Sequence, residues 1–371
     1  MKNNRLKQLG ELGQSVWLDY ISRVLISSGR LRGLIREDGL RGMTSNPSIF
    51  EKAIAEGHDY DAEIRDMALK GMEAKAIYGA ISVRDVQMAA DEFRPVYDST
   101  NAKDGYVSLE VNPHLAHDTL GTIEEARQLW KILDRPNVFI KVPATDEGLI
   151  AIKELTIEGI NINITLLFGL PRYRQVAEAY IAGIEERLAR GKAVDHVASV
   201  ASFFLSRIDT LIDPLLEKIM AQGGSNADIA GQVHGQTAVA SAKMAYRIYK
   251  EMFKSGRFKK LAEKGVLAQR VLWASTGTKN PDYSDVKYID ALIGPDTVNT
   301  IPVETLNAYR DHGDPKQRLE QDAGRALQVM EQLPILGINI DKMTQQLEDE
   351  GIKKFNEPFD KLMATLAMPC T

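Results

Sequence analysis

A lysine inside an apolar segment is the residue whose type and position point most directly to chemistry. Lys141 lies in the sequence Val138-Phe-Ile-Lys-Val-Pro143, where all of its neighbours are apolar. Burying an ammonium ion is costly, and a neutral amine can attack a carbonyl carbon to form a Schiff base. A lysine at a strand end can instead extend its charge into water. The apolar residues on both sides of Lys141 favour the chemical interpretation.

Two carboxylates occupy comparable positions in other segments. Glu110 ends the sequence Tyr106-Val-Ser-Leu-Glu110, and Asp19 ends Val16-Trp-Leu-Asp19. Acids at the carboxyl ends of barrel strands lie where barrel active sites form, and they can act as general acid or base. The alternative is a structural ion pair with an arginine or lysine. Two acids in equivalent places weaken that alternative.

Polar residues alternate with isoleucines in Ile160-Asn-Ile-Asn-Ile-Thr165. Successive side chains of a strand point to opposite faces, so Asn161, Asn163 and Thr165 share one face. An edge strand with one face in water would show the same pattern, but a closed barrel has no edge strand. We therefore expect the polar face to line a site.

Two cations could hold an anion. Arg207 follows the segment Ser202-Phe-Phe204, and Lys279 ends Trp273-Ala-Ser-Thr-Gly-Thr-Lys279. The Ser275-Thr-Gly277 stretch offers hydroxyl and backbone N–H donors, and barrels often bind phosphate near the loops after strands seven and eight. For either cation alone, an ordinary surface ion pair is an equally good explanation.

Eight short segments could position these side chains, and most are followed by a helical pattern. They are residues 15–20, 39–43, 105–111, 138–142, 159–165, 194–204, 270–275 and 288–294. Strands alternating with helices predict a parallel sheet, and eight strands close a (β/α)8 TIM barrel. The sequence shows no internal repeat. We expect one domain over residues 1–371, with a helical insertion around 47–100 and a helical tail around 303–371.

Local signals place some helix ends. The sequence Thr122-Ile-Glu-Glu125 predicts a capping box at a helix start, and Pro136 predicts the end of that helix. In the tail, the patterns predict helices over residues 314–333 and 341–366.

The composition narrows the class of protein. The 371 residues carry a formal net charge of −5, which gives no electrostatic reason to expect nucleic acid. An anionic substrate would therefore need a local basic cluster. No apolar signal segment or membrane-spanning run is visible, so we expect a soluble cytoplasmic protein without a membrane partner, either a monomer or a homodimer.

Common cofactor and metal patterns are missing from the sequence. The single cysteine, Cys370, cannot form an internal disulfide or a multi-cysteine metal site. No GxGxxG, GxxxxGK[ST] or HExxH motif occurs, and we expect His114 and His117 to lie at the surface. The sequence thus predicts no metal and no nucleotide cofactor.

Taken together, these segments resemble the transaldolase family. Gly42-Met-Thr-Ser-Asn-Pro-Ser48 is similar to the first family signature, and Phe139-Ile-Lys-Val-Pro-Ala-Thr-Asp-Glu-Gly-Leu149 is similar to the second, which carries the Schiff-base lysine. Residues 161–168 match the family stretch along the fifth strand, and residues 17–19 and 107–110 supply the acids. The chain length and helical tail resemble the larger bacterial and plant-type branch.

The resemblance implies a class I aldolase-like barrel that transfers a dihydroxyacetone unit without a cofactor. The donor would be sedoheptulose 7-phosphate or fructose 6-phosphate, and the acceptor glyceraldehyde 3-phosphate or erythrose 4-phosphate, in the non-oxidative pentose phosphate pathway. By position, Lys141 would be the nucleophile. Glu110 and Thr165 would handle a catalytic water, and Asp19 would remove the proton from the C4 hydroxyl of the donor.

The resemblance also implies a set of substrate-binding residues. Amide and hydroxyl groups would bind the dihydroxyacetone hydroxyls, an aromatic ring would wall the site, and the remaining residues would bind phosphate: Asn46, Asn163, Ser202, Phe204, Arg207, Ser275 and Lys279. Other branches have an arginine shortly after strand seven. Here Lys279 would replace it as a point charge without the bidentate fork of an arginine.

Three alternatives remain at this level. A fructose 6-phosphate aldolase-type lyase would use the same lysine and release free dihydroxyacetone. A pyridoxal phosphate enzyme also uses a lysine imine, but no matching phosphate loop is visible. A non-catalytic sugar-phosphate-binding barrel would leave a buried lysine unexplained.

Overall fold

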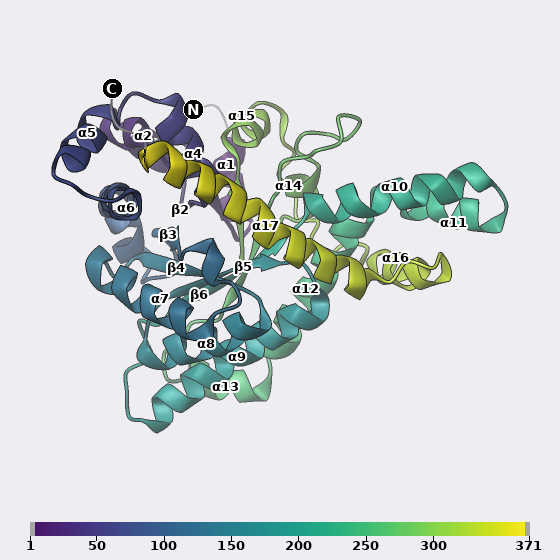
Figure 1. Cartoon of the computed structure of the whole chain (residues 1–371). Helices are drawn as coiled ribbons and strands as arrows, with labels where there is room; N and C mark the ends of the chain where they lie inside the picture. Colours follow the sequence, from purple (N-terminus) through teal and green to yellow (C-terminus); the bar gives the residue numbers. More distant parts are fainter. Residues whose placement is uncertain (1–3, 368–371) are drawn as a thin grey trace.

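A closed parallel sheet of eight strands forms the centre of the computed structural model, which describes residues 4–367 (Figure 1). The strands are β1 (Gln14–Asp19), β2 (Gly42–Thr44), β3 (Tyr106–Glu110), β4 (Val138–Pro143), β5 (Ile162–Leu167), β6 (Ser199–Phe204), β7 (Arg270–Ala274) and β8 (Thr297–Ile301). They pair in chain order, and β8 pairs with β1. The predicted (β/α)8 barrel is confirmed. Cys370 lies outside the described residues.

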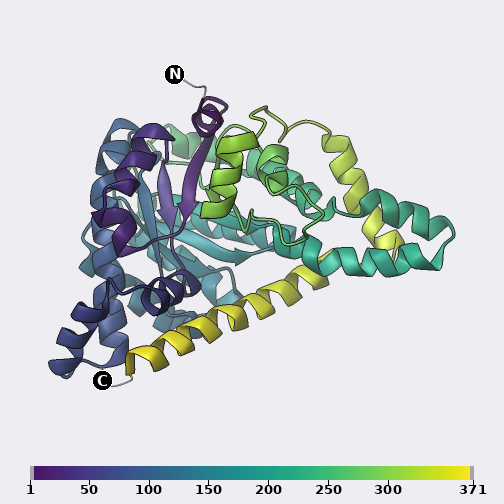
Figure 2. The same ribbon diagram turned by 90° about the horizontal axis from the view of Figure 1, so that it is seen from above.

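Helices surround the barrel and extend beyond it. They are α1 (Arg5–Glu11), α2 (Arg23–Ser27), α3 (Arg30–Glu37), α4 (Pro47–Glu56), α5 (Asp61–Leu69), α6 (Ala74–Ser99), η1 (Pro113–Leu115), α7 (Thr119–Leu133), α8 (Asp146–Glu158), α9 (Leu170–Ala189), α10 (Ser206–Gln222), α11 (Ser225–Val233), α12 (Thr237–Phe253), α13 (Gly256–Ala262), α14 (Lys287–Ala291), α15 (Val303–His312), α16 (Ala323–Ile335) and α17 (Ile340–Ala367). Helices α4, α5 and α6 occupy the long segment between β2 and β3. Helices α10, α11 and α16 project away from the barrel (Figures 1 and 2).

The eighth strand is not where the sequence pattern placed it. The predicted segment 288–294 contains α14, and the strand is Thr297–Ile301. Tyr288, Ile289 and Leu292 are apolar at a spacing that a helix places on one face. The real strand reads Thr-Val-Asn-Thr-Ile, and its polar residues concealed it, although its β-branched residues favour a strand.

Two predicted helix boundaries are also wrong. Helix α7 begins at Thr119 with Asp118 as its N-cap, and the hydroxyl of Thr122 donates to the carbonyl of Leu115. The predicted capping box therefore lies one turn inside the helix. In the tail, the helix predicted from residue 314 begins only at Ala323, and residues 313–322 are not helical. Asp322, which directly precedes α16, has a left-handed φ of +53° that a helix cannot contain.

The lower part of the barrel is filled by aromatic side chains. Phe139 stacks on Tyr106 at a centroid distance of 4.2 Å and on Trp17 at 6.0 Å. A Cβ atom at Gly42 would lie only 2.5 Å from the indole of Trp17, so glycine is required opposite that ring. These three rings, each at most 1% exposed, form an aromatic floor across the interior of the barrel, below the carboxyl ends of the strands.

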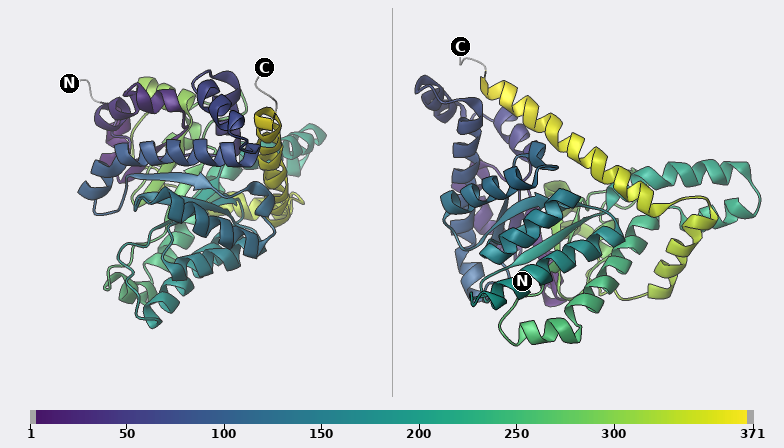
Figure 3. Two further views of the ribbon diagram at one scale, coloured as in Figure 1. Left: turned by 60° about the vertical axis from the view of Figure 1, so that its left-hand side comes forward. Right: turned by 60° about the horizontal axis from the view of Figure 1, so that its bottom comes forward.

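Helix α17 crosses that end of the barrel from the α10 side to the α4 side (Figures 1 and 3). Its buried residues recur every three or four positions and face the barrel: Thr344, Leu347, Glu348, Gly351, Ile352, Phe355, Phe359, Leu362 and Leu366. This period fits an amphipathic helix packed on a core. Among the described helices, none combines the length and apolarity needed to cross a bilayer.

Candidate active site

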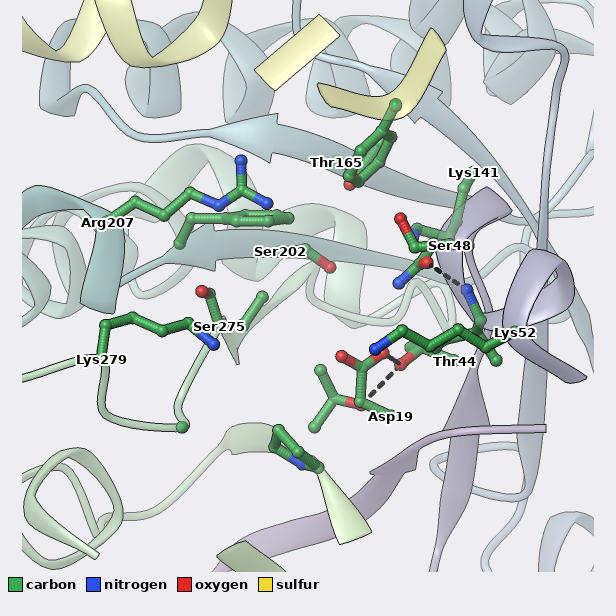
Figure 4. Close-up of a pocket in the computed structure, with 18 residues that line it drawn as sticks. Asp19, Thr44, Ser48, Lys52, Lys141, Thr165, Ser202, Arg207, Ser275 and Lys279 are labelled. Carbon is green, nitrogen blue, oxygen red and sulfur yellow. Dashed lines mark hydrogen bonds between the residues drawn. The ribbon is translucent and has the colours of Figure 1, made fainter. Parts of the chain in front are cut away.

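A cavity of about 290 Å3 opens at the carboxyl ends of the strands, above the aromatic floor (Figure 4). Nine of the residues predicted from the sequence line it: Asp19, Asn46, Lys141, Thr165, Ser202, Phe204, Arg207, Ser275 and Lys279. Barrel active sites form at this face. The cavity therefore gathers these nine residues although Asp19 and Lys279 are separated by 260 positions in the chain.

Lys141 forms a buried ion pair with Glu110. The two residues are neighbours in the β3–β4 register, and Lys141 Nζ lies 3.1 Å from Glu110 Oε2. Nζ also donates a 3.0 Å hydrogen bond to the backbone carbonyl of Ser45. The two ionic side chains are only 6% and 3% exposed. Burial raises the pKa of Glu110, and the charge of Lys141 opposes that rise.

Glu110 and Thr165 retain unused hydrogen-bonding capacity. Within residues 4–367, Glu110 Oε1 and the hydroxyl of Thr165 have no hydrogen-bond partner, and Glu110 Oε2 has only the contact with Lys141. Thr165 is aligned with Pro143 in the β4–β5 register, two residues beyond Lys141. Buried polar groups normally find partners, so both groups can bind water or a substrate hydroxyl beside the lysine.

Asp19 offers a second carboxylate on another side of the cavity. Its Oδ1 accepts a 2.7 Å hydrogen bond from Thr44, whose hydroxyl is also 2.6 Å from that of Thr300 (Figure 4). Burial raises the pKa of Asp19, while the hydrogen bond from Thr44 and the charges of Lys141 and Lys279 oppose the rise. A carboxylate with a raised pKa is a better proton acceptor, which suits a general base.

The two predicted asparagines lie differently. Asn46 lines the cavity and caps α4, because its Oδ1 accepts the backbone N–H of Ile49 at 3.0 Å. Asn163 lies beneath the cavity lining, where its amide donates to Ser108 at 3.0 Å and accepts from Ser202 at 2.6 Å. The structure therefore fixes Asn163 in a hydroxyl–amide layer that carries Ser202.

Asn161, the third polar residue of the β5 pattern, does not line the cavity. Its amide donates to the carbonyls of Pro136 and Val138, and its oxygen accepts the backbone N–H of Ala198. It precedes the first strand residue, Ile162, at the opposite end from the site. The expectation that all three polar residues line a site is wrong for Asn161, because its position before the strand makes it a backbone brace.

Arg207, Ser275 and Lys279 form the cationic end of the cavity (Figure 4). Arg207 lies in the first turn of α10, and the hydroxyls of Ser206 and Ser275 are 2.9 Å apart. Burial lowers the pKa of the Arg207 guanidinium, and one of its nitrogens has no hydrogen-bond partner in the described part of the chain. An incompletely solvated cation at a helix N-terminus favours a bound anion.

The loop that carries Lys279 is tied to α10 through Asp209. The carboxylate of Asp209, 2% exposed, accepts hydrogen bonds from Lys287 at 2.9 Å and from Tyr288 at 2.8 Å. Its other oxygen accepts the backbone N–H of Ala238 at 2.7 Å. Asp209 therefore ties α14, which follows the loop carrying Lys279, to the helix that carries Arg207.

Two side-chain-bearing residues at the site adopt left-handed backbone conformations. Leu166 has a φ of +55° where the β5–β6 register shifts, and Ser275 has a φ of +56° directly after β7. Such conformations are costly for residues other than glycine and cluster at functional sites. The irregularity at Leu166 follows Thr165, and that at Ser275 begins the loop that carries Lys279.

Sequence reasoning missed several residues that line the cavity. Thr44 and Lys52 come from β2 and α4, and Phe355 comes from α17. Thr44 could have been found, because it lies within the signature segment Gly42–Ser48. Lys52 lies one and a half turns beyond Asn46 on a helix, and no local pattern shows that α17 crosses the barrel.

The histidines take no part in the cavity. His114 pairs with Asp360 and His117 with Glu147, and both side chains are exposed. Over residues 4–367, no three His, Cys, Asp or Glu side chains are grouped so that they could hold a metal ion.

Comparison with known proteins gives a consistent result. Residues 16–366 match the family model described as transaldolase/fructose-6-phosphate aldolase. The chain is 46% identical to Transaldolase 2 of Nostoc sp. (strain PCC 7120), an alignment that covers 99% of this chain and 97% of the relative. It is 47% identical to a transaldolase of Trichodesmium erythraeum, with the same coverage. A transaldolase of Saccharopolyspora erythraea is 45% identical over 98% of this chain and 97% of its own length.

Proposed function

Because the chain belongs to the transaldolase/fructose-6-phosphate aldolase family, we propose that it transfers a dihydroxyacetone unit between sugar phosphates through a Schiff base on Lys141. Its activity is that of a transaldolase, a transferase of aldehyde or ketone residues. The finer assignments concern the substrates and the role of each residue. The donor is sedoheptulose 7-phosphate or fructose 6-phosphate, and the acceptor is glyceraldehyde 3-phosphate or erythrose 4-phosphate. The exchange belongs to the non-oxidative pentose phosphate pathway.

The buried pair of Lys141 and Glu110 is the observation that carries the proposal. A nucleophilic amine needs a nearby group that can take its proton and later return one to the departing hydroxyl. Glu110 lies 3.1 Å from Nζ, and burial raises its pKa towards the range where it exchanges protons. A water molecule between Glu110 and Thr165 completes proton transfer while the carbinolamine loses water to form the imine.

Bond cleavage begins at Asp19. The carboxylate accepts the proton of the donor's C4 hydroxyl, the bond between C3 and C4 breaks, and the electron pair passes into the protonated imine. An aldose phosphate leaves, and a neutral enamine of three carbons stays on Lys141. The acceptor aldehyde then adds to the enamine, and Asp19 returns the proton to the new hydroxyl.

The cationic end of the cavity holds the phosphate that donors and acceptors share. Arg207 and Ser275 bind it at the N-terminus of α10, and Lys279 adds a point charge from the opposite loop. Asn46 and Ser202 bind the dihydroxyacetone hydroxyls, with Asn163 positioning Ser202 beneath them. Phe204 forms the apolar wall between the two ends.

Borohydride trapping tests this proposal. The protein is incubated with fructose 6-phosphate, reduced with borohydride and digested, and the peptides are identified by mass spectrometry. We expect a reduced three-carbon adduct on the peptide that contains Lys141. The variant Lys52→Met, which removes another lysine of the same cavity, should retain the adduct, and Lys141→Met should lose it. A folded protein that gives no adduct would exclude the Schiff-base mechanism for this donor.

The aldolase-type lyase remains the second candidate, because the matching family model covers both activities. It uses the same lysine but releases free dihydroxyacetone. Assays of fructose 6-phosphate cleavage with and without erythrose 4-phosphate distinguish the two. A transferase forms sedoheptulose 7-phosphate and requires the acceptor for rapid turnover, whereas a lyase does not.

A further inference from the structure

Phe355 brings an aromatic ring from α17 onto the proposed nucleophile. The ring centroid lies 5.9 Å from Lys141 Nζ, and Phe355 is one of the cavity-lining residues. It is only 5% exposed, although it lies at the side of the cavity that α17 covers. Neither the sequence motifs nor the strand pattern assigns a role to this residue.

The approach of α17 to the barrel is built into its sequence. One turn before Phe355 is Gly351, where a Cβ atom would lie 2.9 Å from Leu166 Cδ2. A side chain at position 351 would therefore require the end of the Leu166 side chain to move, so glycine suits this close approach of α17 to β5. Polar contacts hold both halves of the helix: Glu348 lies 3.4 Å from Arg172 in an ion pair, and Asp360 forms a 2.7 Å hydrogen bond with His114. The ring of Phe355 is thus held in place beside Lys141.

The reaction requires protection at this position. After cleavage, the enamine on Lys141 has two fates. Its nucleophilic carbon can bond to the acceptor aldehyde, which is transfer. Alternatively, that carbon can take a proton from water, and a second water can then hydrolyse the resulting protonated imine to free dihydroxyacetone and the amine. The second route converts fructose 6-phosphate into dihydroxyacetone and glyceraldehyde 3-phosphate, with no net consumption of water.

We infer that Phe355 determines the partition between these fates by excluding water from the enamine on Lys141. A phenyl ring has no proton to give, and its bulk occupies the space that water would need. When the imine is protonated, its positive charge lies within the distance at which an aromatic ring attracts a cation. This inference rests on the proposed function, since it concerns the intermediate that the proposed function forms.

The test compares Phe355→Ala with Phe359→Ala. Phe359 lies one turn further along α17, is also 5% exposed and is absent from the cavity lining. Its ring packs on Tyr78 at 5.6 Å and on His114 at 5.9 Å. Both variants lose the same buried group from the same helix, but only one opens the space beside Lys141. Phe355→Leu, which keeps an apolar side chain, serves if Phe355→Ala does not fold.

The measurement is the ratio of dihydroxyacetone release to sedoheptulose 7-phosphate formation when both fructose 6-phosphate and erythrose 4-phosphate are present. For Phe355→Ala we expect the ratio to rise at least about tenfold, which corresponds to about 1.4 kcal/mol between the two barriers. Phe355→Leu should give a smaller rise, and Phe359→Ala should match the parent protein. In D2O the released dihydroxyacetone should carry one deuterium on the carbon that was bonded to C4.

The inference is refuted if Phe355→Ala leaves the ratio unchanged, or if Phe359→Ala raises it equally. If Phe355→Ala is unfolded, an unchanged ratio in Phe355→Leu refutes it too. The parent protein separates this result from failure of the proposed function. A parent protein that forms sedoheptulose 7-phosphate and the Lys141 adduct keeps the proposed function even when the Phe355 variants show no effect.

Discussion

Replacing Lys141 with methionine removes one member of the buried ion pair and leaves Glu110 behind. The remaining carboxyl is 3% exposed, and neither oxygen has a partner other than Lys141 in residues 4–367. Removing one partner of a buried pair costs about 3–5 kcal/mol of stability, because the other charge stays buried. We therefore expect Lys141→Met to lose all turnover and to be measurably less stable at pH 8, while remaining folded.

The stability loss should depend on pH with a definite sign. Burial raises the pKa of Glu110, and without Lys141 nothing in the pair opposes that rise. An acid whose pKa is higher in the folded state than in the unfolded state stabilises the fold at low pH, and this contribution disappears as the pH rises through the folded-state pKa. The loss in Lys141→Met should therefore shrink on acidification, by at most about 1.4 kcal/mol per pH unit.

Urea unfolding of the variant and the parent protein between pH 5 and pH 8 measures this effect. In thermal unfolding at pH 8, the melting temperature of Lys141→Met should fall by roughly 4–6 °C, given an unfolding entropy of about 2.1 cal/mol/K per residue. The double variant Lys141→Met/Glu110→Gln should recover most of the stability and lose the pH dependence, but stay inactive. Lys52→Met should change neither the stability nor its pH dependence. A loss of stability that is the same at pH 5 and pH 8 would contradict this reasoning.

Two other residues give predictions of different kinds. Asp19→Asn should lower turnover at least about 100-fold, as expected for loss of a general base. It should also stabilise the fold by about 1 kcal/mol at pH 8, because burial raises the pKa of Asp19 and makes its charged form unfavourable. That gain in stability should vanish as the pH falls through the raised pKa of Asp19. Urea unfolding at two pH values measures the stability, and an activity assay measures the turnover. A variant no more stable than the parent protein at pH 8 would contradict the stability prediction. Asp209→Asn should raise KM for glyceraldehyde 3-phosphate up to about tenfold, equivalent to 1.4 kcal/mol, by loosening the loop that carries Lys279. Parallel assays with unphosphorylated glyceraldehyde should show no such rise, and an equal change for both acceptors would indicate a general structural defect instead.

Much of the fold could be predicted because barrel strands carry strong local signals. The apolar segment around Lys141 and the alternation from Ile160 to Thr165 identify β4 and β5 directly. The eighth strand could not be found in this way. Three of its five residues are polar, and the more apolar segment around Tyr288 lies just before it. That the whole chain forms one domain stays a prediction.

Most of the site residues that strands contribute were predictable, as was Arg207 at the start of α10, whereas Lys52 on α4 and Phe355 on α17 were hidden. Asp19, Lys141 and Thr165 alternate with apolar residues, so the sequence alone indicates which face they share. Phe355 reaches the cavity only because α17 crosses the barrel, and this depends on tertiary packing. The carbonyl of Ser45, which accepts a hydrogen bond from Lys141, carries no side-chain signal at all.

The aromatic floor has a consequence for the order of events in turnover. Trp17, Tyr106 and Phe139 close the barrel below Lys141, so molecules cannot pass through it from one end to the other. In the proposed reaction, the cleaved aldose phosphate must therefore depart by the mouth through which the acceptor arrives. Because the proposed enamine stays on Lys141 between these two events, the first product leaves before the acceptor binds, which predicts a ping-pong kinetic pattern with parallel double-reciprocal lines.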